Sequence, residues 1–134
     1  AKPIVDLATL FKDLRQMGFR LGIATNDTEG SAKRTAARLI GADAVDFVAG
    51  CDSGHGGKPE PGMLLAFADA VSVPAGAVAM VGDNVHDLEM GRRGGAGLRI
   101  GVLSGSSGKP DLDPHADHVI GDIGELPALL GAKR

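Results

Sequence analysis

The chain has 134 residues, a formal net charge of -3 and a hydrophobic content of 43%. These values predict a single domain, residues 1–134, that can bury a core. They argue against a nucleic-acid-binding protein, which needs concentrated basic charge, and no apolar run reaches the roughly 18 residues of a membrane helix. The single cysteine, Cys51, excludes an internal disulfide framework, so we expect a cytoplasmic protein.

Apolar residues alternate between helical and strand spacing along the chain, and Pro61 suits the first position of a helix. We place the glycine-rich stretches 54–57, 91–97 and 101–108 in loops. The alternation predicts an α/β fold, a Rossmann-like parallel sheet flanked by helices. In chain order the predicted elements are helix 7–17, strand 20–24, helix 32–40, strand 45–49, helix 61–71, strand 77–81, helix 87–93, strand 98–103, strand 118–120 and helix 123–130.

Polar residues follow the first predicted strand directly. Thr25 and Asn26 lead into a helix, and the free N–H groups at a helix start attract an anion such as phosphate. The alternative is an ordinary helix cap. Taken by itself, this segment favours the cap.

The segment Lys58-Pro59-Glu60-Pro61 holds a lysine just before a helix. A proline after Lys58 keeps the lysine backbone out of the helical region. A lysine fixed in such a loop can neutralise a phosphate or a crowded carboxylate. The alternative, which the sequence favours equally, is a lysine in solvent before a helix that starts with proline.

Two carboxylates, Asp83 and Asp87, follow the strand 77–81 at a spacing of four residues. Ligands of open α/β sheets bind at the carboxyl ends of the strands, and oxygen ligands suit Mg²⁺. In the alternative interpretation, Asp83 is the N-cap of the next helix and Asp87 is an acid of its first turn. Taken alone, the pair favours neither interpretation.

The order of these residues resembles the haloacid dehalogenase superfamily of phosphohydrolases, and within it the phosphoglycolate phosphatases and related enzymes. Three ordered segments carry the resemblance, and together they are specific where each alone is not. Residues 21–26 resemble the second motif of the superfamily, residues 57–61 the third and residues 82–87 the fourth. The segments 116–120 and 124–127 resemble its last strand and helix.

The resemblance implies a Mg²⁺-dependent phosphatase that hydrolyses small phosphorylated metabolites through an aspartyl-phosphate. It implies that Thr25 and Asn26 hydrogen-bond the phosphoryl group and that Lys58 stabilises its charge. Asp83 would bind Mg²⁺ directly, and Asp87 would act at the metal directly or through water. This division of roles agrees with phosphoryl transfer, which depends on positioning and charge stabilisation.

The first motif of the superfamily, a strand that ends in Asp-x-Asp-Gly and supplies the nucleophile, is missing before Thr25. The segment Asp111-Leu112-Asp113 follows a glycine-rich loop and precedes a proline, so we do not assign it this role. The missing strand would lie between the strands that end at Thr25 and Asp83, so we expect unpaired backbone and an apolar seam there. We therefore expect the chain to be the carboxyl-terminal part of a longer protein, with the seam covered by the amino-terminal segment or by another chain.

Three consequences stay open at this stage. In the superfamily, cap domains select the substrate, and no cap is present, so the substrate is undefined. We expect this chain alone to be inactive. The alternatives are a phosphate- or partner-binding remnant without a nucleophile and, with much less support, a receiver-like phospho-acceptor domain, in which the acids precede the threonine and lysine.

Overall fold

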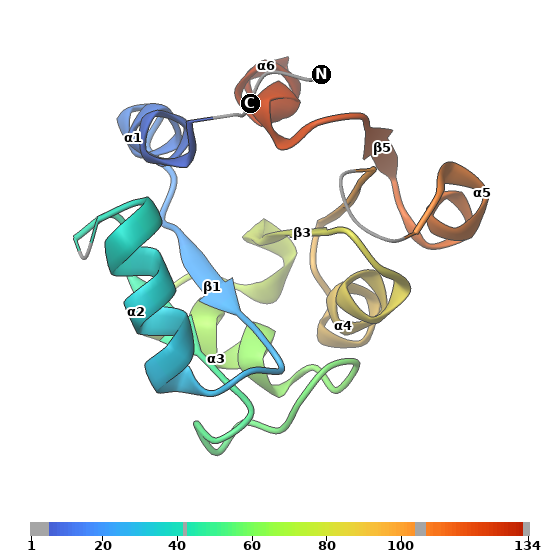
Figure 1. Cartoon of the computed structure of the whole chain (residues 1–134). Helices are drawn as coiled ribbons and strands as arrows, with labels where there is room; N and C mark the ends of the chain where they lie inside the picture. The colour runs from blue at the N-terminus through green and yellow to red at the C-terminus, as the bar shows by residue number, and fades with distance from the viewer. Residues whose placement is uncertain (1–5, 42, 104–106, 133–134) are drawn as a thin grey trace.

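Helices and strands alternate along the chain, as the sequence predicts (Figure 1). The structure is a computed structural model that describes residues 6–41, 43–103 and 107–132. Short 3₁₀ turns lie at 75–77, 113–115 and 123–125. In order, the elements are α1 (Leu7–Gln16), β1 (Gly22–Ala24), α2 (Glu29–Leu39), β2 (Phe47–Ala49), α3 (Gly62–Ala70), β3 (Ala79–Gly82), α4 (Val85–Gly94), β4 (Leu98–Val102), α5 (Lys109–Leu112), β5 (His118–Ile120) and α6 (Leu126–Ala132).

Side-chain caps set where several helices begin. The Asp6 carboxylate accepts the N–H groups of Ala8 and Thr9 at the start of α1, at 3.1 and 3.3 Å. The hydroxyl of Thr28 caps α2, which therefore begins three residues earlier than the apolar spacing predicts. Pro61 lies just before α3 instead of at its first position. Within the described residues, no helix has the length and apolar character needed to cross a membrane.

The prediction of a loop at 91–97 is wrong for its first residues. Gly91 and Gly94 are buried in α4, and Gly101 lies in β4. A Cβ at Gly91 would lie 2.9 Å from Cβ of Met80, so the glycine allows α4 to pack closely on β3. The sequence also misses α5, because four residues are too few to show helical spacing.

The strands form two parallel sheets. One sheet pairs β1 with β2, and the other has the order β3-β4-β5. β1 and β3 therefore each have one hydrogen-bonded neighbour among the described strands. Every residue of β1 and β3 keeps some solvent exposure, whereas Ile100 and Val102 of β4 are 0% and 3% exposed. The prediction of an α/β fold with parallel strands flanked by helices is confirmed, and among the described residues no strand pairs with both β1 and β3.

Two apolar clusters cover opposite faces of the strands (Figure 1). The first cluster brings α1 and α6 onto one face, and its buried residues are Leu10, Leu14, Ile100, Val102, Ile120, Leu126 and Leu130. The second brings α3 and α4 onto the other face, and its buried residues are Ala49, Met63, Leu64, Ala68, Val78 and Met90. We call the space between the facing edges of β1 and β3 the seam.

Candidate functional site

The polar segment after β1 turns away from the strand through local hydrogen bonds. The N–H of Thr25 donates to the carbonyl of Ala49 at 3.1 Å, which continues the pairing with β2 for one residue. The hydroxyl of Thr25 accepts the N–H of Asp27 at 3.1 Å. The cap of α2 is Thr28, so Thr25 and Asn26 remain in the turn at the carboxyl end of the strand.

Asn26 holds the loop that carries Lys58. Its Oδ1 accepts the backbone N–H of Lys58 at 2.8 Å. A Cβ on the neighbouring Gly57 would lie 3.0 Å from the same oxygen, so the glycine leaves room for this contact. A cis peptide bond joins Lys58 to Pro59. The side chain of Asn26 thus holds the backbone of Lys58 in place.

The ammonium of Lys58 forms an ion pair with Oδ1 of Asp87. Both side chains are largely shielded, with 14% of Lys58 and 4% of Asp87 exposed. Oδ1 of Asp87 accepts no hydrogen bond of good geometry in the described structure, so the lysine charge is its main compensation. A Cβ at Gly82 would overlap the Asp87 carboxylate, which explains why glycine ends β3.

Asp87 has a second role in the first turn of α4. Its N–H donates to Oδ1 of Asn84 at 3.2 Å, and its Oδ2 faces the N–H of Asn84 at 3.4 Å, so the two residues form a capping box. The N-cap of α4 is therefore Asn84, and the alternative that Asp83 caps this helix is wrong. The alternative that Asp87 is an acid of the first turn is confirmed.

Asp83 lies exposed at the same edge. Its Oδ1 is 3.4 Å from Nδ2 of Asn84, a weak contact. The structure therefore joins Asn26, Lys58 and Asp87 by direct contacts and adds Asp83 through Asn84. Asn84 has no predicted role, although its Asn-x-x-Asp spacing carries the capping-box signal.

The segment Asp111-Leu112-Asp113 lies elsewhere and has structural contacts. Leu112 is fully buried. The carboxylate of Asp111 accepts the N–H of Gly108 at 3.2 Å, and Asp113 pairs with Lys109 at 2.7 Å. These residues belong to α5 and the turn after it, so the segment is not the end of a strand.

A second polar network lies where β2 ends and α2 begins. The hydroxyl of Ser53 donates to Oε1 of Glu29 at 2.7 Å and accepts the N–H of Gly50 at 2.8 Å. Hydrogen bonds from Lys33 and Ser53 lower the pKa of Glu29 below its usual value. Apolar spacing does not predict this network, because Glu29 and Ser53 lie 24 positions apart.

The donor set fits a lightly coordinated Mg²⁺ better than a site enclosed by protein ligands. Residues 6–41, 43–103 and 107–132 contain no group of three or more His, Cys, Asp or Glu side chains that could hold a metal. Mg²⁺ is commonly held by one or two carboxylates with water and substrate phosphate. Asp83 is exposed and makes a weak contact with Asn84, so it suits this role, whereas Asp87 forms an ion pair with Lys58.

The sequence is similar to a family of hydrolases and to several phosphatases. The model of the haloacid dehalogenase-like hydrolases matches residues 1–95. Phosphoglycolate phosphatase of Rhodospirillum rubrum is 35% identical over 119 residues, which cover 88% of this chain and 48% of that protein. D-glycero-beta-D-manno-heptose-1,7-bisphosphate 7-phosphatase of Escherichia coli (strain K12) is 26% identical over 147 aligned positions, covering 89% and 75% respectively.

Solved structures share the fold. A Lactobacillus delbrueckii subsp. bulgaricus protein, proposed to be a phosphoglycolate phosphatase, superposes with a TM-score of 0.83 at 26% identity over 96% of this chain and 53% of its own. A HAD family hydrolase from Deinococcus radiodurans R1, described with bound phosphate and sodium, gives a TM-score of 0.82 at 24% identity over 96% and 59%. The chain thus spans about half the length of the Rhodospirillum and Lactobacillus proteins.

Proposed function

Because the chain belongs to the haloacid dehalogenase-like hydrolases, we propose that the whole protein is a Mg²⁺-dependent phosphatase for small phosphate monoesters such as phosphoglycolate. The similarity to the phosphoglycolate and heptose bisphosphate phosphatases supports this proposal. The observation that carries it is the line of contacts from Asn26 through Lys58 to Asp87 at the carboxyl ends of β1 and β3. Ligands of open α/β sheets bind at this edge.

Three side chains would bind and orient the phosphoryl group. Lys58 supplies a positive charge that Asp87 holds in place. The Oδ1 of Asn26 is used by Lys58, so its Nδ2 group is the donor for a phosphoryl oxygen. The Thr25 hydroxyl accepts a hydrogen bond from Asp27 and has its own proton to donate. Catalysis of phosphoryl transfer depends on such positioning and charge stabilisation.

Asp83 would hold the metal directly, and Asp87 would act there through water while it keeps its contact with Lys58. Bound Mg²⁺ would neutralise negative charge on the phosphoryl oxygens. We assign the nucleophile, an aspartate that becomes aspartyl-phosphate, to a segment outside these 134 residues. The chain alone would then bind phosphate weakly and not turn over. We place the protein in the cytoplasm.

The test is a phosphatase assay of the complete gene product against a panel of phosphate monoesters, with Mg²⁺ and with a chelator. We expect Mg²⁺-dependent release of phosphate, a large loss of activity in Asp83→Asn, and normal activity in the matched control Asp113→Asn. The 134-residue chain should be inactive in the same assay. Full activity of Asp83→Asn, or turnover by the chain alone at the rate of the complete protein, would contradict the proposal.

The second candidate is a phosphate-binding protein without catalysis. The observation in its favour is that, within the described residues, α1 is the element that precedes β1, so no strand that could end in a nucleophilic aspartate comes before Thr25. Isothermal titration of the complete protein with inorganic phosphate separates the two functions. Saturable binding that depends on Lys58, without phosphate release from any monoester, would favour the binding protein.

A further inference from the structure

Residues 50–58 form the loop that carries Lys58, and the glycine-rich stretch 54–57 lies just before that lysine. Gly54 and Gly56 have φ values of +89° and +82°, in a region that glycine adopts readily and other residues rarely do. Glycine loses more conformational freedom on ordering than any other residue. Contacts outside the glycine-rich stretch must therefore hold Lys58 in place.

The start of this loop is bound to the turn that follows β1. The N–H of Cys51 donates to the carbonyl of Asp27 at 2.8 Å. The carboxylate of Asp52 accepts the N–H of Glu29, also at 2.8 Å. A Cβ on Gly50 would overlap the backbone nitrogen of Glu29, so glycine allows the two backbones to approach closely. The start of the loop and the turn thus form one hydrogen-bonded unit.

The side chains of Ser53 and Glu29 join the same two segments. The Ser53 hydroxyl donates to Oε1 of Glu29 at 2.7 Å, and it accepts the N–H of Gly50 at 2.8 Å. Glu29 is the first residue of α2, so the serine ties the loop to the beginning of that helix. Hydrogen bonds from Lys33 and Ser53 lower the pKa of Glu29, and the ionised carboxylate is an acceptor for the hydroxyl proton.

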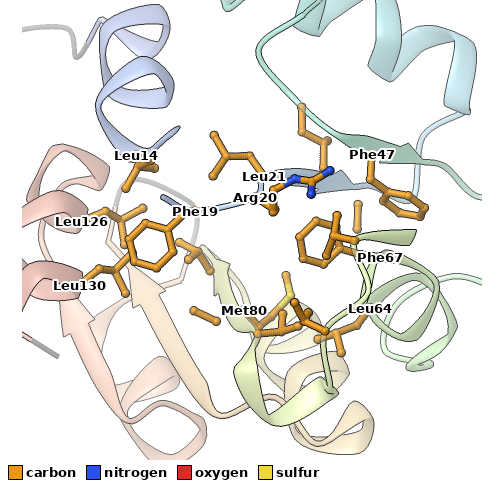
Figure 2. A pocket seen from close by; sticks show the side chains of 18 of the residues that line it. Leu14, Phe19, Arg20, Leu21, Phe47, Leu64, Phe67, Met80, Leu126 and Leu130 are labelled. Carbon is orange, nitrogen blue, oxygen red and sulfur yellow. The ribbon is translucent and has the colours of Figure 1, made fainter. Parts of the chain in front are cut away.

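The middle of the loop packs on aromatic side chains. The ring of His55 lies 6.2 Å from the ring of Phe47, which in turn meets Phe67 edge-on at 5.9 Å. Phe47 and Phe67 line the apolar cavity in the seam (Figure 2). A Cβ on Gly62 would overlap the carbonyl oxygen of His55, so the start of α3 also contacts the backbone of His55. These contacts hold the middle of the loop against β2 and α3.

Both ends of the loop meet the turn 25–29. At the far end, the backbone N–H of Lys58 donates to Oδ1 of Asn26 at 2.8 Å. At the start, Ser53 contacts Glu29. Asn26 and Lys58 belong to the phosphoryl site proposed above, so the distance between the loop and the turn decides how both groups meet one phosphoryl group. A misplacement of about 1 Å can lower the rate of an enzyme by about 100-fold.

We propose that Glu29 and Ser53 are positioning residues for the phosphoryl site. They hold the loop that carries Lys58 against the turn that carries Asn26, and they act through these two residues. The inference rests on the proposed phosphatase function, because it assigns Glu29 and Ser53 a part in the same reaction. Without their contact, the Lys58 ammonium would leave the position in which it best stabilises the charge of the transition state.

The test measures kcat and KM of the complete protein with p-nitrophenyl phosphate. Ser53→Ala should lower kcat by roughly tenfold or more and change KM by less than about threefold, because the lost positioning acts in the transition state. Ser53→Thr keeps the hydroxyl and should restore kcat to within about threefold of the unchanged protein. The matched control is Ser31→Ala, whose backbone N–H makes the cap contact of α2; it should change kcat by less than about twofold.

A second variant reaches the same contact from the other side. Glu29→Ala removes the acceptor and should lower kcat as Ser53→Ala does. The double variant should lose little more than either single variant, because both substitutions remove one contact. Glu29→Gln keeps an oxygen acceptor and should lose less. Circular dichroism checks that each variant is folded, and either single variant tests the inference if the other is not.

Hydrogen exchange at the Lys58 amide of the complete protein gives a readout without catalysis. This amide should exchange roughly tenfold faster in Ser53→Ala than in Ser53→Thr or Ser31→Ala. If the complete protein releases no phosphate, the proposed function fails, and the exchange rate alone decides whether Ser53 holds the loop. Unchanged exchange or unchanged kcat in Ser53→Ala, a rise in KM alone, or no recovery in Ser53→Thr would overturn the inference.

Discussion

Removing the positive charge of Lys58, which pairs with Asp87, should destabilise the fold. The variant Lys58→Met removes this charge with little loss of side-chain volume. The Asp87 carboxylate is only 4% exposed, and its Oδ1 depends on the Lys58 ammonium. Breaking a buried ion pair from one side typically costs about 3–5 kcal/mol. Asn84 and the start of α4 still compensate Oδ2, and Lys58 is 14% exposed, so we expect about 2–3 kcal/mol.

Urea unfolding followed by circular dichroism measures this loss. The double variant Lys58→Met with Asp87→Asn should lose less than the sum of the single variants, because the unpaired charge is gone. The matched control is Lys33→Met, whose pair with Glu29 is exposed and should therefore contribute little to stability. If Lys58→Met is as stable as the control, Asp87 does not depend on the lysine.

Further predictions concern the geometry around this pair. Gly82→Ala should displace the Asp87 side chain, because the new Cβ would overlap it; we expect a loss of about 1–3 kcal/mol from overpacking, measured by urea unfolding, and an unchanged stability would contradict the placement of Asp87. Asn26→Ala should release the backbone of Lys58, which we expect to appear as faster hydrogen exchange at the Lys58 amide. Burial raises the pKa of Asp46, but the N–H of Leu21 and two guanidinium groups outweigh it, so the pKa lies below the ordinary 3.8. A carboxylate whose pKa is lowered in the folded state stabilises the fold at pH values above its ordinary pKa. This stabilisation is lost as the pH falls through the pKa of the folded state. Asp46→Asn should therefore be less stable at pH 7, with a difference that shrinks below pH 3.8; a pH-independent difference would refute the role of the charge.

The sequence predicts the elements of this fold well where the spacing of apolar residues is long enough to repeat. The strand 118–120 is found with the predicted bounds, and most other elements differ by a few residues at their ends. α2 begins early because a side-chain cap, which apolar spacing does not record, starts it at Thr28. The prediction places Gly91 in a loop, because a glycine in a helix carries no local signal of the strand it packs against.

The candidate site, like the fold, is predicted from the sequence only in part. The order of Asn26, Lys58 and Asp87 along the sequence predicts a shared edge, and the structure joins them there. Their mutual arrangement could not be predicted, because residues 32 and 29 positions apart meet only through the crossover connections. The contact of Asp87 with Lys58 also depends on the missing side chain at Gly82, which apolar spacing does not record.

The division of the strands into two sheets has a consequence for the way the molecule unfolds. The β1–α2–β2 unit spans residues 22–49, and the unit from β3 to β5 spans residues 79–120. Among the described strands, no ladder crosses between the units, which are bridged by α3 through its contacts with β1, β2 and α4. Cooperativity between two such units depends on their shared interface. The chain by itself should therefore melt in two stages, with the smaller unit first.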